Sequence, residues 1–145
     1  VAFMTESLHI EKGNKVLEVG TGSGFQTAVL SKLGAKVSTI EINKKLFKES
    51  SKRLNDLGYD DISFHQGDGN KGVPEQSPYD RILVTAAPTE IPRDLLGQLD
   101  INGIMVIPVG NQSGVQYLYK IKKLDDDKIE EEKILPVHFV PLIKS

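Results

Sequence analysis

The stretch KVLEVGTGSGFQ, residues Lys15–Gln26, decides the fold, because it passes from an apolar run through a glycine-rich turn into a segment of helical character. The apolar, partly β-branched residues up to Val19 are typical of a short buried strand in a parallel sheet. The turn carries three glycines at alternate positions: Gly20, Gly22 and Gly24. Glycine permits positive φ and lets the backbone approach a ligand that a Cβ would push away. The helix expected over residues 26–33 then points the N–H groups of its first turn at this loop.

The glycine spacing favours one class of ligand over another. A dinucleotide-binding turn has the pattern G-x-G-x-x-G, whereas the sixth residue counted from Gly20 is Phe25. With Glu18 ahead of the turn, the pattern is E-x-G-x-G-x-G. That is the first motif of methyltransferases that use S-adenosylmethionine (SAM), a cofactor that carries no phosphate. The spacing therefore predicts a SAM site, and a glycine-rich structural loop in another α/β protein is the alternative.

The other residues of this motif are expected to take part in the cofactor site. A carboxylate at the end of a strand needs a partner. We expect Glu18 to bind the methionine ammonium group of SAM, directly or through water. The remaining loop residues of the predicted cofactor site are Thr21 and Ser23.

Composition excludes several other kinds of site. The chain has 145 residues, 39% of them hydrophobic, and a formal charge of −2, as expected for one globular domain without a basic field for nucleic acid. It has no cysteine, which excludes disulfides, thiolate nucleophiles and Cys-ligated metals. Its three histidines, His9, His65 and His138, show no metal-ligand spacing. No apolar run approaches the ~20 residues of a membrane span, so we expect a cytoplasmic protein without a metal site.

Helix and strand patterns alternate along the first two thirds of the chain. Helices are expected over residues 4–10, 26–33, 44–57 and 91–99, with Asn43 as an N-cap and Pro92 near the start of the last helix. Strands are expected over residues 15–19, 36–42, 61–66, 80–85 and 104–109, with Asn102-Gly103 as a turn before the last strand. This alternation predicts a doubly wound, mostly parallel, Rossmann-like α/β sheet.

The last third of the chain shows no helical pattern. Residues 116–123 and 129–140 are strand candidates on either side of an acidic turn at 125–128. We expect them to form antiparallel strands at one edge of the sheet, with the acidic residues on a solvated turn and strand face. Residues 1–145 are therefore expected to form a single SAM-dependent methyltransferase domain.

Two further carboxylates are expected at the ends of the second and third strands. Glu41 lies 21 residues after Gly20, where it can accept hydrogen bonds from both hydroxyls of a ribose. Asp68 lies between Gly67 and Gly69, where it can accept a hydrogen bond from the adenine amino group. A surface glutamate and an ordinary Asp-Gly turn are the alternatives. Because the carboxyl ends of parallel strands meet at one edge of a sheet, the signals at three strand ends together favour a cofactor site.

Several segments together resemble the protein-L-isoaspartate O-methyltransferase family over nearly the whole chain. They are VLEVGTGSGFQTAVLSKLGAKV, IEI, GYDDISFHQGDG, PYDRILVTAAP, IPRDLLGQLDINGIMVIPVG and LPVHFVPL, of which VTAAP and PVHFVPL are specific to that family. The resemblance implies methyl transfer from SAM to the free α-carboxylate of an L-isoaspartyl residue, with S-adenosylhomocysteine (SAH) as the other product. The ester closes to a succinimide that reopens partly to aspartate. The implied function is the repair of aged proteins and peptides. The sequence does not determine the oligomeric state; we expect a monomer, and the charge and hydropathy of the chain predict neither nucleic acid nor membrane as a partner.

The chain departs from this family at two places. In the family, a Ser/Thr-Gln-Pro-like stretch runs into V-A-x-M-T, and this sequence opens at VAFMT, the tail of that stretch. We therefore expect residues to be missing upstream of Val1, among them the hydroxyl residue credited with a role near the transferring methyl, so no catalytic residue is assigned. His138 stands where the family often has arginine, and no charge-dependent role is assigned to it.

The substrate is expected near the fourth strand and the last strand. Thr85, Ala86 and Ala87 follow the fourth strand and are small, so a peptide backbone could lie close to them. Val137 and His138 could hydrogen-bond a peptide through their main-chain groups. The alternatives are a plain loop after the fourth strand and a core position for Val137.

Two other functions stay open from the sequence alone. One is methyl transfer to another carboxylate or to a small molecule. Thr85-Ala86-Ala87-Pro88 stands where an amino-group methyltransferase would be expected to show Asp/Asn-Pro-Pro-Tyr/Phe, which counts against that class. The other is a non-catalytic SAM-binding module or an inactive fragment, which the expected missing segment favours.

Overall fold

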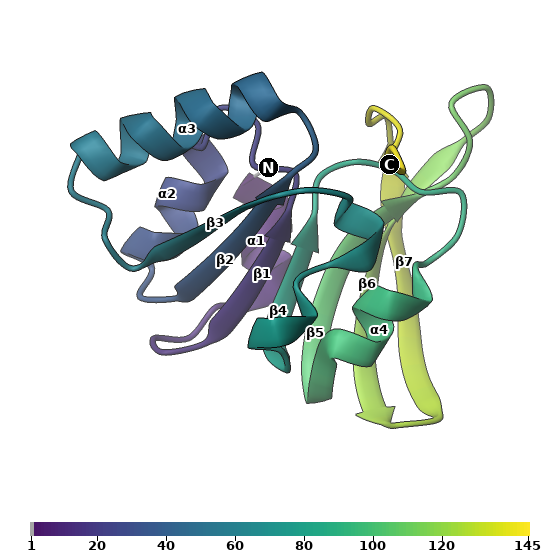
Figure 1. Ribbon diagram of the computed structural model, residues 1–145. Coiled ribbons are helices and arrows are strands. Elements are labelled where there is room, and N and C mark those ends of the chain that lie inside the picture. Colours follow the sequence, from purple (N-terminus) through teal and green to yellow (C-terminus); the bar gives the residue numbers. More distant parts are fainter. Residues whose placement is uncertain (1) are drawn as a thin grey trace.

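Seven strands form one sheet in the structure, a computed structural model that describes residues 2–145 (Figure 1). The strand order is β3-β2-β1-β4-β5-β6-β7, with β1 to β5 parallel and the last two strands antiparallel to their neighbours. The strands are β1 (Lys15–Val19), β2 (Lys36–Glu41), β3 (Ile62–Gln66), β4 (Tyr79–Val84), β5 (Leu99–Val109), β6 (Gln116–Asp125) and β7 (Lys128–Val137). The predicted fold class, a mostly parallel Rossmann-like sheet with antiparallel C-terminal strands, is confirmed.

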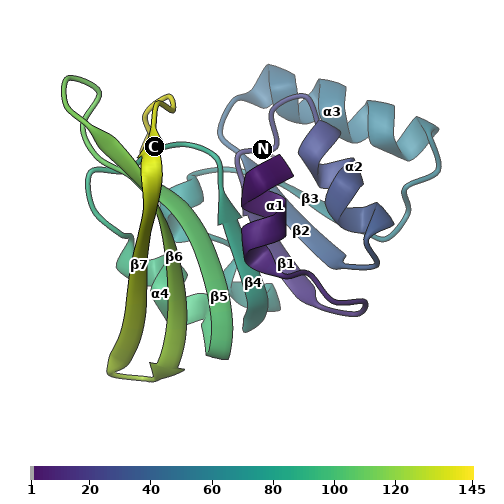
Figure 2. The same ribbon diagram turned by 180° about the vertical axis from the view of Figure 1, so that it is seen from behind.

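Helices cover both faces of the sheet. The helices on one face, seen in Figure 2, are α1 (Ala2–Leu8), α2 (Phe25–Lys32) and α3 (Lys44–Asp56). The other face carries α4 (Arg93–Gln98) and two short 3₁₀ helices, η1 (Gly69–Lys71) and η2 (Pro74–Gln76). The strand order reverses between β1 and β4, and in open α/β sheets this switch point is where ligands bind.

Local sequence signals account for most helix ends. Asn43 caps α3 as predicted, because its side chain accepts a hydrogen bond from Leu46 N at 3.0 Å. The first helix spans Ala2–Leu8, whereas residues 4–10 were predicted. It ends before the predicted residue 10 because His9 takes a left-handed φ of 52°. The last helix begins at Arg93, because Pro92 is its extended N-cap and not a residue of its first turn.

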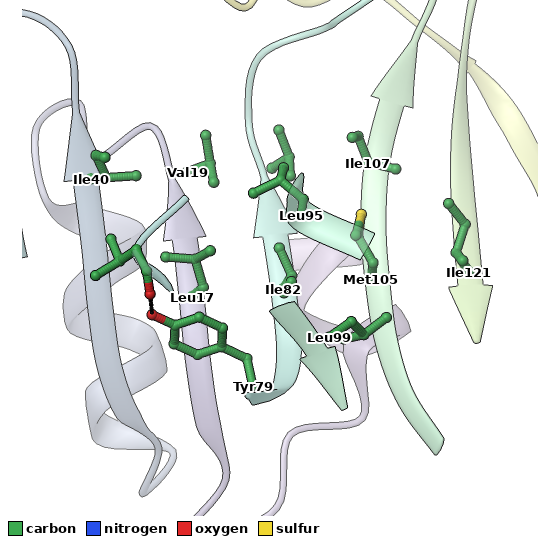
Figure 3. Close-up of a cluster of buried hydrophobic side chains, with 12 residues drawn as sticks. Leu17, Val19, Ile40, Tyr79, Ile82, Leu95, Leu99, Met105, Ile107 and Ile121 are labelled. Carbon is green, nitrogen blue, oxygen red and sulfur yellow. Dashed lines mark hydrogen bonds between the residues drawn. The ribbon is translucent and has the colours of Figure 1, made fainter. Parts of the chain in front are cut away.

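The core consists of two apolar clusters, one on each face of the sheet. Figure 3 shows the cluster under α4, in which Leu17, Ile82 and Met105 are fully buried on neighbouring strands. Tyr79 belongs to this cluster and donates a hydrogen bond from its hydroxyl to Val73 O at 2.6 Å. Burial on both faces explains why the central strands are nearly continuous apolar runs.

The fifth strand differs from the prediction. Asn102-Gly103 was expected as a turn before this strand, but both residues lie inside β5. Asn102 has a left-handed φ of 66°, and the register between β4 and β5 shifts at this point. The turn-forming residues therefore make an irregularity within the strand, of the kind that a β-bulge introduces, instead of ending it.

The last strand ends earlier than predicted. β7 stops at Val137, and the chain then leaves the edge of the sheet and runs beside the loop that follows β4 (Figure 1). There Ala87 N donates to Val140 O at 2.8 Å, and Leu142 N donates to Ala87 O at 3.0 Å. Residues 139–145, which we call the C-terminal segment, are thus attached to the loop that follows β4.

Candidate functional site

A cavity of about 500 Å³ lies beside the carboxyl ends of β1, β2 and β4, next to the switch point of the sheet. Its volume is typical of a small-molecule site. The structure brings six of the predicted site residues together around it: Gly20, Gly22, Glu41, Gly69, Thr85 and Ala86. They come from four separate stretches of sequence, so the sheet topology is what assembles them.

The glycine loop, residues 20–24, needs glycine for two different reasons. Gly20 has a φ of 101°, and a Cβ built on it would lie only 2.5 Å from Thr85 Oγ1. Gly22 has a φ of 56°, and a Cβ there would meet no atom within 4 Å, so its backbone faces open space. The loop is thus packed against β4 at Gly20 and open at Gly22, where a ligand could lie against the main chain. Gly24 caps α2, and Ser23 is exposed outside the cavity wall.

Glu41 holds the rim of the cavity with both carboxylate oxygens. Its Oε1 accepts a hydrogen bond from Gly22 N at 2.8 Å, and its Oε2 accepts one from Asn43 N at 2.9 Å. The side chain is 7% exposed, so these backbone donors replace most of its hydration. A carboxylate has about four acceptor positions, so two remain for hydroxyl donors of a ligand in the cavity.

Glu18 lies beneath the glycine loop and does not line the cavity. It is fully buried, and its Oε1 accepts hydrogen bonds from Thr27 Oγ1 at 2.5 Å and Thr39 Oγ1 at 2.7 Å. Its Oε2 is buried without a hydrogen-bond partner among residues 2–145. In this structure the Glu18 carboxylate is therefore not exposed at the cavity wall, where the predicted contact with a ligand ammonium group would require it. Thr21, also predicted as a cofactor residue, turns its hydroxyl towards Thr39 instead, at 2.6 Å.

Burial makes Glu18 sensitive to pH. Loss of hydration raises the pKa of Glu18 from 4.5 to about 7, although the hydrogen bonds from Thr27 and Thr39 favour the ionised form; the negative charge of Glu41 adds to the rise. Between these two pKa values the folded state binds more protons than the unfolded state. The stabilising contribution of the protonated group is therefore complete below about pH 4.5 and is lost as the pH rises through about 7.

We expect Glu18→Gln to remove this pH dependence. In the wild type, the contribution of Glu18 to the free energy of unfolding should fall by on the order of 3 kcal/mol across that window, since one pKa unit corresponds to about 1.4 kcal/mol. Urea unfolding of both proteins at several pH values would measure the difference. Wild-type and variant profiles that run parallel throughout the window would contradict a titrating Glu18.

Asp68 lies near the cavity, but both of its carboxylate oxygens already accept hydrogen bonds within the protein. Its Oδ1 accepts hydrogen bonds from Asn70 N at 2.9 Å and Asn70 Nδ2 at 3.0 Å, and its Oδ2 accepts one from Ser145 N at 3.2 Å. Burial opposes ionisation, but the hydrogen bonds from Asn70 and Ser145 outweigh it, so the pKa of Asp68 is lowered. Gly69 lines the cavity, and a Cβ there would collide with Val19, so the chain passes close to the end of β1. Gly67 donates its N–H to Glu41 O at 3.0 Å and joins β2 to this turn.

The three predicted substrate residues after β4 have different surroundings. Thr85 and Ala86 line the cavity, and Thr85 Oγ1 lies 3.1 Å from both Val19 O and Gly20 O. Ala87 is buried, and both of its main-chain groups bind the C-terminal segment. Its backbone is therefore not free to receive a peptide in this structure.

The two predicted substrate residues at the end of β7 lie away from the cavity. Val137 pairs with Gln116 of β6 and is half-buried against the core. His138 is exposed just beyond the strand. The structure thus does not bring these two residues to the cavity wall. The hydroxyl residue that the family resemblance led us to expect upstream of Val1 lies outside the described residues.

Sequence reasoning missed one wall of the cavity. Residues 140–143 of the C-terminal segment line it, together with Asn43 and Leu46 from the start of α3. The only sequence signal that covers part of this wall is the family-specific segment PVHFVPL, residues 136–142, and it does not indicate contact with a cofactor cavity. Residues 140–142 reach the cavity by binding Ala87 in the loop after β4, which is a contact of the tertiary fold. Asn43 carried a detectable signal, but that signal was its capping role.

Other hollows and clusters lack comparable chemistry. An apolar hollow of about 600 Å³ lies between α1 and α2, and it contains none of the predicted site residues. Across residues 2–145 no group of three or more His, Cys, Asp or Glu side chains could hold a metal ion. Within the same residues no helix is long and apolar enough to cross a membrane.

Comparison with known proteins gives a consistent family match. The family model of protein-L-isoaspartate(D-aspartate) O-methyltransferase matches residues 1–145. The protein-L-isoaspartate O-methyltransferase of Rhodospirillum rubrum is 46% identical over 144 residues, which cover 99% of this chain and 66% of that protein. The protein of the same name from Gloeobacter violaceus is 45% identical and is covered over 70% of its length. The chain thus spans about two thirds of the length of these curated relatives.

Solved structures show the same fold. A protein-L-isoaspartate O-methyltransferase superposes with a TM-score of 0.91 at 32% identity, over 97% of this chain and 45% of that one. A second structure, from Plasmodium falciparum, is described as a putative enzyme of this kind in complex with SAH. It superposes with a TM-score of 0.83 at 24% identity, over 99% of this chain and 71% of that one.

Proposed function

This chain belongs to the protein-L-isoaspartate(D-aspartate) O-methyltransferase family, and from that premise we propose that it binds SAM and transfers its methyl group to the free α-carboxylate of L-isoaspartyl residues. The observation that carries the proposal is the cavity at the switch point, where Glu41 and the open backbone of Gly22 lie side by side. The chain spans only part of its relatives, so the activity is a proposal for the protein as a whole.

The cavity fits this cofactor in size and in the polar groups at its rim. Its volume of about 500 Å³ suits a nucleoside with a short amino-acid arm. We assign the ribose hydroxyls to the two remaining acceptor positions of Glu41. The unobstructed main chain at Gly22 would face the amino-acid arm, and the turn at Gly69 would face the adenine.

We propose Asp68 as the acceptor for the adenine amino group, on condition that the adenine shares or replaces one of the present hydrogen-bond donors to its carboxylate. Its Oδ2 is bound by Ser145 N at the longest of its three hydrogen bonds, 3.2 Å. Adenine could share or take over that position while Asn70 keeps Oδ1. Glu18 is proposed to act on the methionine ammonium group only through the loop above it, since its carboxylate is fully buried.

The proposed chemistry needs few catalytic groups from the protein. When bound, SAM supplies an electrophilic methyl group on a sulfonium. The accepting carboxylate is already ionised at neutral pH, so no general base is required. The residues beside the cavity would act by positioning and by excluding water. Thr85 and Ala86 are small and would leave room for a peptide backbone at the cavity mouth.

Val137 and His138 are proposed as a more distant docking edge for the peptide. β7 is the outer strand of the sheet, so its free side offers main-chain groups for β-augmentation. We further propose that the protein acts as a monomer on isoaspartyl proteins and peptides, without nucleic acid or membrane as a partner. A cytoplasmic setting is proposed with it, and the absence of cysteine means that no disulfide ties the chain to an oxidising compartment.

Methylation of matched peptides tests the proposed function. Labelled methyl from SAM should be transferred to a peptide that contains L-isoaspartate and not to the same peptide with L-aspartate. The two peptides carry equal charge and differ only in where the main chain continues, so discrimination must come from shape and backbone hydrogen bonds. Equal labelling of both peptides would overturn the isoaspartyl assignment, and failure to bind SAH would overturn the cofactor assignment as well.

A further inference from the structure

Two threonine hydroxyls, those of Thr27 and Thr39, bind the buried carboxylate of Glu18, and neither residue has a role in the site described above. A third hydroxyl, that of Thr21, binds Thr39. Glu18, Thr27 and Thr39 are fully buried, and Thr21 is 5% exposed. Glu18 on β1 and Thr39 on β2 are register partners in the parallel sheet, which places them side by side on one face. Thr27 reaches the same carboxylate oxygen from α2.

The direction of each hydrogen bond follows from counting protons. Thr27 and Thr39 both donate to Glu18 Oε1, at 2.5 Å and 2.7 Å. A hydroxyl has only one proton, so Thr39 has none left for its 2.6 Å contact with Thr21 Oγ1. When Glu18 is ionised, Thr21 must therefore be the donor there. The result is a series of hydrogen bonds with one direction, from Thr21 through Thr39 to Glu18.

This series of hydrogen bonds begins in the glycine loop. Thr21 stands between Gly20 and Gly22, the two loop residues that line the cavity. Gly22 is held from the rim by Glu41 through its N–H, at 2.8 Å. The loop is thus held at the rim by one carboxylate and from below by a second carboxylate, which acts through Thr39.

We propose that Thr39 is a positioning residue for the cofactor: through Thr21 it fixes the glycine loop in the conformation that receives SAM. This rests on the proposed function, since it assigns a role within the same site. Thr39 itself touches neither the cavity nor a ligand, and it acts by holding Thr21. A buried hydroxyl placed between a buried carboxylate and a ligand-binding loop keeps the loop ordered before the ligand arrives, which lowers the cost of binding.

Thr27 provides a matched control within the same network. It donates to the same oxygen of Glu18 and is equally buried, but it lies on α2 and, within residues 2–145, forms no hydrogen bond with the loop residue Thr21. Thr27→Val and Thr39→Val therefore remove the same kind of bond from the same acceptor, in exchange for a side chain of the same shape. Only the second substitution cuts the link to the glycine loop.

Titration of each unliganded protein with SAH by calorimetry, together with urea unfolding, tests the assignment. We expect both valine variants to lose stability, Thr39→Val the more because it breaks two hydrogen bonds and Thr27→Val one. Thr39→Val should also raise the SAH dissociation constant by about tenfold. Thr27→Val should keep an affinity within about twofold of the wild type. Thr39→Ser, which retains the hydroxyl, should restore most of the affinity. Thr21→Ala cuts the link from the loop side and should weaken binding as much as Thr39→Val.

The outcomes separate this inference from the proposed function. If the wild type does not bind SAH, the proposed function fails. If the wild type binds SAH and Thr39→Val binds it equally well, Thr39 is not a positioning residue. Equal weakening by Thr27→Val would also overturn the assignment, because the effect would then come from the buried carboxylate as a whole. Should Thr39→Val not fold, Thr21→Ala decides in its place, and wild-type affinity in that variant would overturn the link.

Discussion

Gly20→Ala is expected to lower the free energy of unfolding by about 2–4 kcal/mol, with a loss of SAH affinity on the order of tenfold or more. Two costs add at this position. The φ of 101° is unfavourable for any residue with a Cβ, and that Cβ would lie 2.5 Å from Thr85 Oγ1. Thr85 cannot move away freely, because its N–H donates to Val19 O at 3.0 Å and its hydroxyl is bonded to the same loop.

Gly58 is a matched control that isolates the clash from the backbone strain. It has a φ of 92°, close to that of Gly20, but a Cβ there would meet nothing within 4 Å. Gly58→Ala should therefore cost only the conformational penalty, about 1–2 kcal/mol, and leave SAH binding unchanged. Urea unfolding and calorimetry measure both effects.

A double-mutant cycle gives a second check on the clash. Thr85→Ala removes the hydroxyl and leaves its Cβ 3.8 Å from the new methyl group, an ordinary contact distance. Gly20→Ala combined with Thr85→Ala should therefore be more stable than the two single effects predict. Additive effects, or equal losses at Gly20 and Gly58, would show that close packing against β4 is not what requires glycine.

Most of the fold could be predicted because its signals are local. Short apolar runs, helical periodicity and glycine punctuation mark the strands and helices in order, and Asn43 caps α3 as its residue type predicts. The exceptions are places where a local signal was overruled by the sheet. Asn102-Gly103 is a turn-forming pair, but β5 continues in the same direction before and after it. The two residues therefore form an irregularity inside β5.

In the candidate site too, positions with local signals could be predicted, and contacts that depend on the tertiary fold could not. Gly20, Gly22 and Glu41 could be predicted, because motif spacing and the rule that ligands bind at strand ends locate them before any contact is known. The depth of Glu18 could not, since a carboxylate near a strand end is compatible with either the ligand side or the helix side of the sheet. The partners of Glu18 also depend on register: Thr39 is its cross-strand neighbour only because β1 and β2 are aligned as they are.

The C-terminal segment marks the limit of sequence reasoning. The last strand was expected to run to Val140, but it ends at Val137. The C-terminal segment instead binds the loop after β4, and its residues 140–143 form a wall of the cavity. That path is set by hydrogen bonds between distant parts of the chain, such as Phe139 N to Gln116 Oε1 at 2.7 Å and Leu142 N to Ala87 O at 3.0 Å. No periodicity in residues 139–145 could indicate it.

Glu41→Ala is expected to weaken SAH binding on the order of 100-fold. The substitution removes the proposed acceptor of two ribose hydroxyls, and hydrogen bonds to a charged group are each worth about 1.5–3 kcal/mol. It also releases Gly22 N and Asn43 N, which Glu41 now holds at 2.8 Å and 2.9 Å. Glu49→Ala serves as the control for charge, because Glu49 is an exposed carboxylate on α3 whose ion pair with Lys45 is a loose surface contact of 3.9 Å. That variant should bind SAH like the wild type.

Glu41→Gln tests whether the two carboxylate acceptors are needed, or only a side chain of that size and shape. If only size and shape mattered, the amide would bind SAH like the wild type. In the structure each oxygen accepts from a different backbone N–H, and an amide can satisfy only one of the two. Its NH₂ group would face the second N–H, donor against donor. We therefore expect Glu41→Gln to lose nearly as much SAH affinity as Glu41→Ala, despite its similar shape.

The hydrogen bond between Gly22 N and Glu41 also predicts which cofactors do not bind. In a dinucleotide-binding loop, backbone N–H groups such as that of Gly22 are free to bind a pyrophosphate. Here Glu41 Oε1 already occupies Gly22 N, so a phosphate would meet a carboxylate in place of a donor. Calorimetry with NAD should therefore show no binding under conditions in which SAH binds. Binding of NAD and SAH with similar affinity, or wild-type SAH affinity in Glu41→Ala, would remove Glu41 from the cofactor site.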